Sequence, residues 1–137
     1  MYEAFLGTWT LEPASCVYEQ SEAPAESTHR IFVEGKKLII TMHWTLADAT
    51  KHQMQFSGIP NGKPMPFAGG ELADALAIHA ISKRELTTSA YWKGKEIMLS
   101  QRQLDDTGSA MRVTQIVRFQ GGTHAANVGV YRKNSQA

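Results

Sequence analysis

The chain has 137 residues, of which 42% are hydrophobic and 20% charged, and its 14 basic side chains nearly balance 13 acidic ones. This length is typical of one domain and this composition of a folded globular protein, so residues 1–137 are expected to form a single domain rather than a disordered chain. The sequence has no basic stripe and no apolar run of about 20 residues, which argues against nucleic acid as a partner and against a membrane span.

The N-terminal residues indicate the compartment. The short stretch before Gly7 has neither the basic nor the apolar region of a signal peptide. The one cysteine, Cys16, cannot form a disulfide within the chain. We therefore expect a cytoplasmic protein.

The first predicted strand, residues 5–12, carries the segment FLGTWTL. Gly7 removes a side chain at a point where a strand of a closing barrel must bend. Trp9 is large enough to fill the narrow end of a barrel, and its indole N–H can donate to a backbone carbonyl there. The next residues, 12–27, contain two prolines and little periodicity, which predicts a long irregular connection.

Alternation with a period of two predicts strands through the middle of the chain. These strands cover residues 28–34, 37–47 and 50–58. With a turn at residues 47–50, Trp44 and His52 become neighbours on adjacent strands, whereas His43 points to the other face. Strands with one apolar face, such as KLIITMHWTL, belong to antiparallel sheets.

The segment GELADALAIHAI, residues 70–81, has two interpretations. Its alanines favour a helix, whereas the neighbouring glycines and the strand-like AIHAIS favour a turn followed by a strand. We expect at most one short helical turn near residues 70–76, between strands at 63–67 and 75–82.

The C-terminal half continues the alternation and places polar side chains on apolar faces. Strands are predicted at residues 86–93, 95–104, 110–120 and 126–133. Gln115 shares a face with Met111, and Arg102 shares one with Met98, although the opposite face of the Arg102 strand is the alternative inward one. A buried amide or guanidinium needs a partner, and in a hollow barrel that partner can be a ligand.

Ten short strands joined by tight turns predict an all-β fold, either a barrel or a sandwich. The GTW motif that begins at Gly7 and the closing segment NVGVYRK resemble the calycin superfamily, which includes the lipocalins and the fatty-acid-binding proteins. LGTWTLEPA and NGKPMPF are more similar still to the small bacterial lipocalin-like proteins of uncharacterised function. The resemblance implies a single lipocalin-like, antiparallel up-and-down β-barrel of about 8–10 strands over residues 1–137. It also implies that Arg132 stacks on Trp9, so that Gly7, Trp9 and Arg132 close the barrel. The alternative for Arg132 is a solvated charge at the surface.

The chain departs from the fatty-acid-binding proteins in two places. Those proteins clamp a ligand carboxylate with an Arg-x-Tyr on the last strand, where this chain has Gly129 and Tyr131. They also carry a helical lid between the first two strands, whereas residues 12–27 are broken by proline. Both departures argue against a fatty-acid carrier of that kind.

Five histidines raise the question of a metal or a haem. They are His29, His43, His52, His79 and His124. None forms a His-x-His or His-x-x-x-His pair, and a zinc site needs three or four convergent ligands. We predict no metal site and no cofactor, and a single histidine bound axially to haem, as in some calycin relatives, stays an alternative.

We expect the barrel to bind a small apolar or amphipathic molecule in its interior. The predicted ligand-binding residues are Trp44, His52, Met54, Phe56, Arg102, Gln115 and Tyr131. One alternative is a barrel enzyme of the cyclase, isomerase or dehydratase type, in which His52 and Arg102 would converge on a small hydrophobic substrate. Another is an interaction module with a filled core, such as a homodimer joined through a sheet edge. No catalytic residue is assigned.

Overall fold

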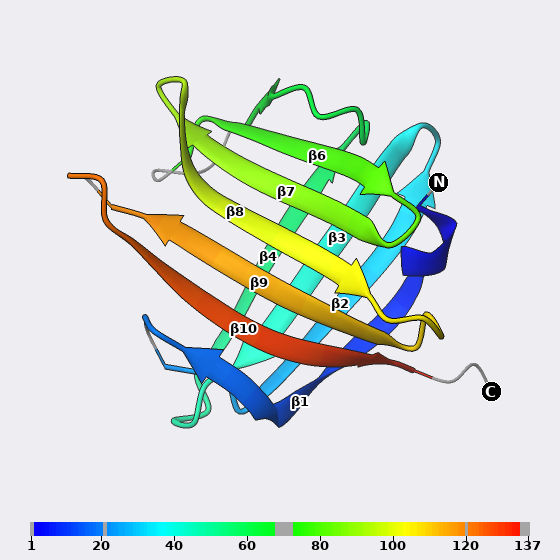
Figure 1. The fold of residues 1–137 in the computed structure, drawn as a ribbon, viewed down its shortest axis with the longest axis vertical. Helices are drawn as coiled ribbons and strands as arrows, with labels where there is room; N and C mark the ends of the chain where they lie inside the picture. The colour runs from blue at the N-terminus through cyan, green and yellow to red at the C-terminus, as the bar shows by residue number, and fades with distance from the viewer. Residues whose placement is uncertain (1, 21, 68–72, 120, 135–137) are drawn as a thin grey trace.

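The computed structural model describes residues 2–20, 22–67, 73–119 and 121–134. They form one ten-stranded antiparallel sheet that curls into a barrel, and within them only η1 (Glu3–Phe5), a 3-10 turn, is helical (Figure 1). The strands are β1 (Gly7–Tyr18), β2 (Glu26–Glu34), β3 (Lys37–Thr45), β4 (Lys51–Gly58), β5 (Met65–Pro66), β6 (Ala75–Ser82), β7 (Glu85–Trp92), β8 (Lys95–Leu104), β9 (Ala110–Arg118) and β10 (His124–Lys133). The all-β fold expected from the sequence is confirmed.

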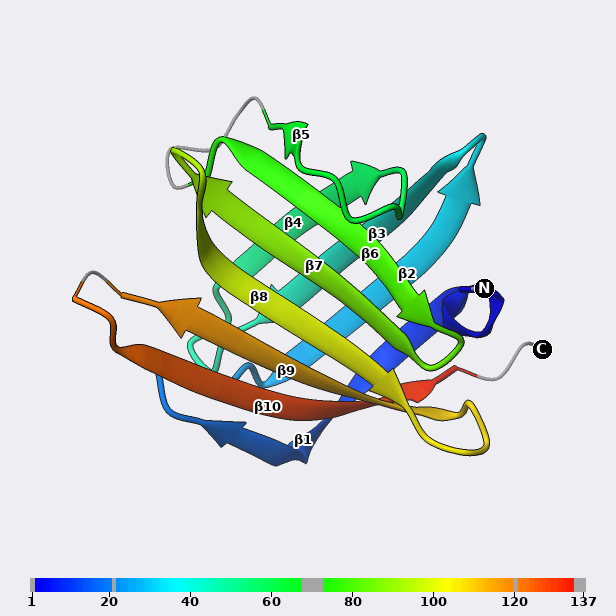
Figure 2. The same ribbon diagram turned by 45° about the horizontal axis from the view of Figure 1, so that its top comes forward.

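The order of the strands identifies an up-and-down barrel. Consecutive strands pair from β1 to β4 and from β5 to β10, and β1 also pairs with β10. The remaining seam lies between β4 and β6, where the chain after β4 bridges to β6 through Asn61 and His79. A backbone hydrogen bond from Gly62 N to Ile78 O, 2.8 Å long, reinforces this bridge. The sheet is therefore nearly closed on itself and is not split into the two layers of a sandwich (Figure 2).

β1 is longer than the sequence suggested, because it runs on through Pro13, where an irregular connection was expected. A bulge that follows Glu12 accommodates the proline, which cannot donate to a ladder. The Ser15 hydroxyl holds the bulge to β10, since it accepts a hydrogen bond from the backbone N–H of Val130 at 2.8 Å. Pairing with β2 stops at Thr10, so the second half of β1 pairs with β10 alone.

The helical turn expected near residues 70–76 falls partly outside the described residues. Ala75 and Leu76 are described, and both belong to β6, where they pair with Tyr91 and Ala90 of β7. Pairing with a neighbouring strand here outweighs the helix propensity of alanine.

Trp9 lies fully buried at one end of the barrel. Its indole N–H donates to the backbone carbonyl of Phe5 in η1 at 2.9 Å, and η1 lies across that end of the barrel (Figure 2). Other apolar side chains, fully or almost fully buried, pack in one core cluster with the rings of Trp9 and Phe5. They include Ile31, Leu38, Ile40, Leu86 and Met111. This end of the barrel is therefore filled by side chains.

The cation beside Trp9 is Lys133 and not Arg132, so the expected Arg132 contact is wrong. The Nζ atom of Lys133 lies 5.5 Å from the centroid of the Trp9 ring, which is typical of a cation–π contact. Arg132 points outward, and its Nε donates to Oε1 of Glu12 at 2.6 Å on the surface. Successive residues of a strand face opposite sides, so a shift of one position exchanges interior for solvent.

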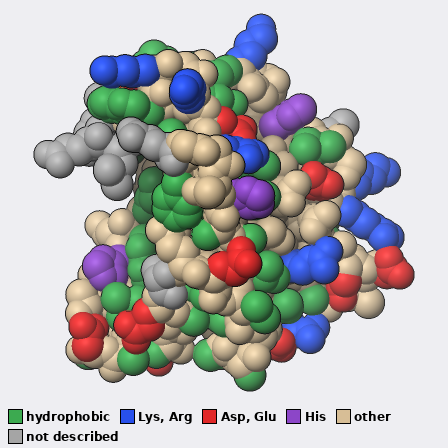
Figure 3. Space-filling view, turned by 60° about the vertical axis from the view of Figure 1, so that its left-hand side comes forward, with side chains coloured by type: hydrophobic (Ala, Val, Ile, Leu, Met, Phe, Trp, Pro, Cys, Tyr) green, Lys and Arg blue, Asp and Glu red, His purple; other side chains and the backbone are tan. Residues whose placement is uncertain are grey.

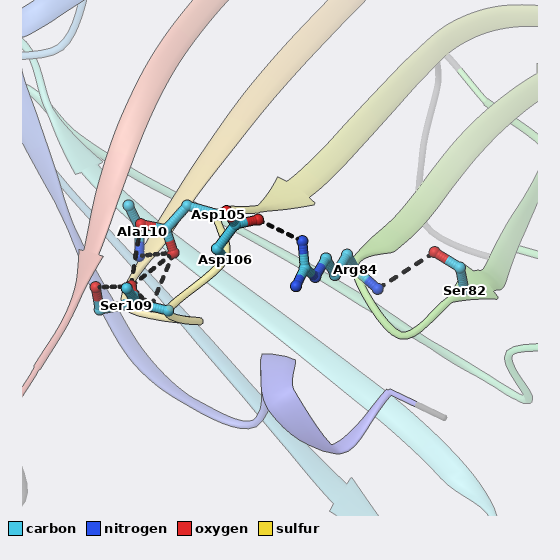
Figure 4. A network of polar contacts seen from close by, with 7 residues as sticks. Ser82, Arg84, Asp105, Asp106, Ser109 and Ala110 are labelled. Atoms are coloured by element: carbon cyan, nitrogen blue, oxygen red, sulfur yellow. Dashed lines mark hydrogen bonds and ion pairs between the residues drawn. The ribbon is translucent and has the colours of Figure 1, made fainter.

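Asp105 holds the turn between β8 and β9 (Figure 4). Its carboxylate accepts hydrogen bonds from the backbone N–H groups of Ser109 and Ala110, at 3.2 and 3.3 Å. The adjacent Asp106 pairs with Arg84, in the turn between β6 and β7, at 2.6 Å. These exposed contacts link two neighbouring hairpins at the surface of the barrel.

Candidate functional site

A cavity of about 330 Å³ occupies the end of the barrel away from Trp9. Its lining includes Tyr18 at the end of β1, Ser27 near the start of β2 and Trp44 near the end of β3. Figure 3 turns the left-hand side of Figure 1 forward and shows hydrophobic side chains among the charged ones on that face. The barrel is thus packed at one end and hollow at the other.

Apolar side chains from four strands form one part of the cavity wall. They are Met42 and Trp44 of β3, Met54 and Phe56 of β4, Met98 of β8, and Val113 and Val117 of β9. The two positions are two residues apart on β3 and on β4 and four apart on β9, so each pair lies on one face of its strand, as the pleat requires. The three methionines can adapt this wall to ligands of different shape.

Arg102 of β8 lies at the base of the cavity and is 1% exposed. Its Nη1 donates to the hydroxyl of Thr88 at 3.0 Å, and its Nη2 lies 3.8 Å from the sulfur of Met42 on β3. Because β8 and β3 are not neighbours in the sheet, this side chain crosses the barrel interior. The buried Nε has no hydrogen-bond partner, and within the described residues no carboxylate forms an ion pair with the guanidinium.

His29, Tyr131 and Ser27 form a second polar group on the cavity wall. The hydroxyls of Ser27 and Tyr131 share a hydrogen bond of 2.7 Å, and the rings of His29 and Tyr131 lie 4.2 Å apart between centroids. The Nδ1 atom of His29 is buried and has no partner among the described residues. His29 pairs with Met42 across the β2–β3 ladder, which brings it close to the Arg102 head group.

Burial decides the charge of these groups. It lowers the pKa of Arg102 to about 10, which leaves the guanidinium charged at neutral pH. Burial, and then the Arg102 charge, lower the pKa of His29 well below its usual value, so the imidazole is neutral. Burial raises the pKa of Tyr131 to about 12, so the phenol keeps its proton. Of these three groups, only the guanidinium carries a charge at neutral pH.

The cavity brings together most of the residues expected to bind a ligand. Trp44, Met54, Phe56, Arg102, Gln115 and Tyr131 line it. His52 is exposed and lies outside the lining, although its ring stacks on Trp44 with centroids 5.5 Å apart. The two are neighbours in the β3–β4 ladder, as the sequence predicted, but the structure does not bring His52 together with Arg102.

Sequence reasoning missed four buried polar residues of the lining: Ser27, His29, Ser100 and Asn127. A signal for two of them exists, because Ser27 and His29 alternate with the buried Ile31 in ESTHRIF. A histidine on the apolar face of a strand indicates a polar group in the barrel interior, as Arg102 does on β8. The buried Ser100 confirms that the Arg102 face of β8 is the inward one.

The described residues offer neither a cluster of metal ligands nor a helix that could span a membrane. Within them, no three His, Cys, Asp or Glu side chains lie close enough together to hold a metal ion. Across the same ranges, no helix is long and apolar enough to cross a membrane.

No protein-family model matches the chain, and no curated protein matches it in sequence. Solved structures do match in fold. The zebrafish ileal bile acid-binding protein complexed with cholic acid superposes with a TM-score of 0.57 at 16% identity, over 96% of this chain and 99% of that one. The siderocalin Ex-FABP, described as functioning through dual ligand specificities, gives 0.51 at 7% identity, over 98% of this chain and 76% of its own.

At these identities the likeness concerns the fold alone. The chain shares its barrel fold with these two ligand-binding proteins. The predicted resemblance is confirmed at this level.

Proposed function

We propose that this protein binds a small amphipathic molecule with an anionic end, which lies in the cavity with that end against Arg102. Its apolar part would contact Met42, Met54, Trp44 and Phe56. The observation that carries this proposal is the buried Arg102, whose guanidinium faces a cavity and has a hydroxyl and a thioether as its hydrogen-bond partners.

The energetic cost of Arg102 supports an anion as the missing partner. Taking a guanidinium out of water costs several kcal/mol unless a counter-charge and hydrogen bonds compensate it. A thioether is a weak acceptor, and Nε has no acceptor among the described residues. A carboxylate would accept hydrogen bonds from two guanidinium nitrogens at once and would neutralise the charge. The neutral His29 next to it does not compete for the anion.

The volume of the cavity limits the size of the molecule. About 330 Å³ is room for roughly ten water molecules at about 30 Å³ each. This is at the small end of ligand pockets, which span about 300–1,000 Å³. A medium-chain carboxylic acid is of this size. The structural neighbour in complex with cholic acid supports an amphipathic acid as the class of ligand.

Calorimetric titration with decanoate and decanol tests this function on protein that has been unfolded and refolded to remove any molecule carried through purification. Decanoate should bind, and decanol, which lacks the charge, should bind far more weakly. In Arg102→Met the affinity for decanoate should fall about 30-fold or more, since losing one member of a buried charge pair costs about 2–5 kcal/mol.

Arg112→Met is the matched control, because Arg112 lies on β9 with its side chain exposed and bonded to Gln103. Equal affinities of the wild-type protein for decanoate and decanol would contradict the anionic end. No binding of either would contradict the function itself.

Binding is favoured over catalysis by the position of His52. The enzyme hypothesis needs two or more ionisable groups that converge inside the barrel, with His52 and Arg102 as its first candidates, and the exposed His52 lies outside the cavity.

A further inference from the structure

The cavity contains a further group of polar side chains, away from Arg102 and towards the open end. Asn127 of β10 is 4% exposed, and its side-chain oxygen accepts hydrogen bonds from the backbone N–H groups of Glu19 and Gln20, both at 3.0 Å. Glu19 is held in turn, because its carboxylate accepts from the backbone N–H of Ala126 at 2.6 Å. The Asn127 amide is therefore fixed in one orientation.

The orientation of Asn127 determines that of Gln115. With its oxygen turned to the chain after β1, Asn127 directs its amide nitrogen to Oε1 of Gln115, at 3.5 Å. Oε1 is thereby identified, and the amide nitrogen of Gln115 lies on the other side, 3.1 Å from the sulfur of Met98. The hydrogen-bonding atoms of Gln115 are thus assigned by neighbours that are themselves fixed.

Gln115 has more hydrogen-bonding capacity than these neighbours use. A primary amide offers two donors and an acceptor with two lone pairs, and a thioether is a weak acceptor. The contact with Asn127 is at the long limit for a hydrogen bond. Leaving an amide unsatisfied on the otherwise apolar inner face of β9 costs free energy. Gln115 lines the cavity, so its free donor and lone pair are available to a molecule inside it.

Ser100 adds a hydroxyl to the same place. It lies directly opposite Gln115 in the β8–β9 ladder and also lines the cavity. Arg102 is two residues further along the same face of β8, which separates the two positions by about 7 Å along the strand. A molecule whose anionic end contacts Arg102 would pass Ser100 and Gln115 on its way to the open end.

We propose that the ligand carries a second, uncharged polar group, a hydroxyl or a carbonyl, which hydrogen-bonds to Gln115 and Ser100. This inference rests on the proposed function and narrows its ligand class to hydroxylated or oxo-substituted amphipathic acids. An unsubstituted hydrocarbon chain would cover the Gln115 amide without offering it a partner.

Titration of the wild-type protein with decanoate and with the positional isomers of monohydroxydecanoate tests the inference. At least one isomer should bind about tenfold more tightly than decanoate, the gain expected from one hydrogen bond to an amide that otherwise lacks a good partner. In Gln115→Leu the affinity for that isomer divided by the affinity for decanoate should fall to one or below, because leucine favours an unsubstituted hydrocarbon chain.

Gln101→Leu is the matched control, since Gln101 lies on β8 between Ser100 and Arg102 and faces the other way. Ser100→Ala provides a second variant that lowers the same ratio if Gln115→Leu fails to fold. Decanoate binding with no isomer preferred, as when water alone satisfies Gln115, would overturn this inference and leave the proposed function standing. An isomer preference that survives both substitutions would overturn it too. No binding of any of these acids would overturn both.

Discussion

Arg102 keeps a positive charge inside the barrel, and this has a cost in stability. Replacing a buried ion pair by apolar side chains of similar volume is often neutral or stabilising, by about 1–4 kcal/mol, and a buried charge without a counter-charge has even less to offset its desolvation. Thr88 would lose one donor, at a cost of about 1 kcal/mol. We therefore predict that Arg102→Met raises the free energy of unfolding by about 1–3 kcal/mol while it abolishes the preference for an anion.

Urea denaturation of ligand-free protein at neutral pH measures this change, with the exposed Arg112→Met as the control. A lower denaturation midpoint for Arg102→Met than for the wild type would mean that the guanidinium stabilises the barrel. That result would remove the energetic reason for an anionic ligand.

His29 makes stability depend on pH. Burial, and then the Arg102 charge, hold the pKa of His29 well below its usual value in the native state, whereas an unfolded histidine titrates near 6.5. As the pH falls through about 6.5, the unfolded chain therefore takes up a proton that the native state does not, and stability decreases by up to about 1.4 kcal/mol per pH unit. His29→Gln should reduce this slope between about pH 7.5 and 5.5.

The measurement is urea denaturation at several pH values across that interval. His43→Gln is the control, because His43 is exposed on the outer face of β3. If the free energy of unfolding depends on pH with the same slope in the wild type and in His29→Gln, then the native state does not lower the pKa of His29.

The residues of the site could be predicted only in part. Gln115 and Arg102 stood out because each is polar on an apolar alternating face, and such a pattern fixes the side of the sheet. Alternation with Met54 and Phe56 predicts an interior His52, yet this residue lies next to the turn, beyond the end of the cavity. A period of two determines the face of a strand and not the depth along the barrel.

Among the structural elements, β1 depends most on a single glycine. Gly7 has a φ of +136°, a backbone conformation that residues with a side chain rarely adopt. A Cβ there would also lie 3.0 Å from Cε of Lys133, which is flexible enough to move. Backbone strain should therefore dominate, and we predict that Gly7→Ala lowers the free energy of unfolding by about 1–3 kcal/mol.

Chemical denaturation tests this prediction, and repeating it in a Lys133→Ala background separates strain from the contact with the lysine. Gly58→Ala is the control, since Gly58 is buried but has no positive φ, and its added Cβ would meet only Ile78, at 4.0 Å. Recovery of full stability in the double variant would assign the effect to the lysine contact instead.

The second half of β1 could not be predicted from its sequence. Pro13 and the lack of alternation in residues 12–27 indicate a loop. Towards β2 this is correct, because β1 does not pair with β2 beyond Thr10. What continues the strand is the contact of Ser15 with Val130, which lies at the other end of the chain. Contacts between residues so far apart in sequence leave no periodic signal.

At the scale of the whole molecule, the barrel is divided into two halves. Trp9 and Phe5 fill one end, the cavity occupies the other, and the Arg102 side chain crosses the interior at the base of the cavity. The strands and their order could be predicted because alternation and turns are local. Whether the interior is filled depends on which side chains meet across the barrel, and one sequence does not specify that.

This division predicts which tryptophan responds to a ligand. Trp44 lines the cavity, Trp9 lies fully buried among apolar side chains, and Trp92 is 41% exposed at the end of β7. Decanoate should therefore change the intrinsic fluorescence through Trp44, because only this indole exchanges water for an apolar neighbour. Trp44→Phe should lose the fluorescence change while calorimetry still detects heat of binding, and Trp92→Phe should keep it. A response that persists in Trp44→Phe and disappears in Trp92→Phe would place the ligand outside the barrel.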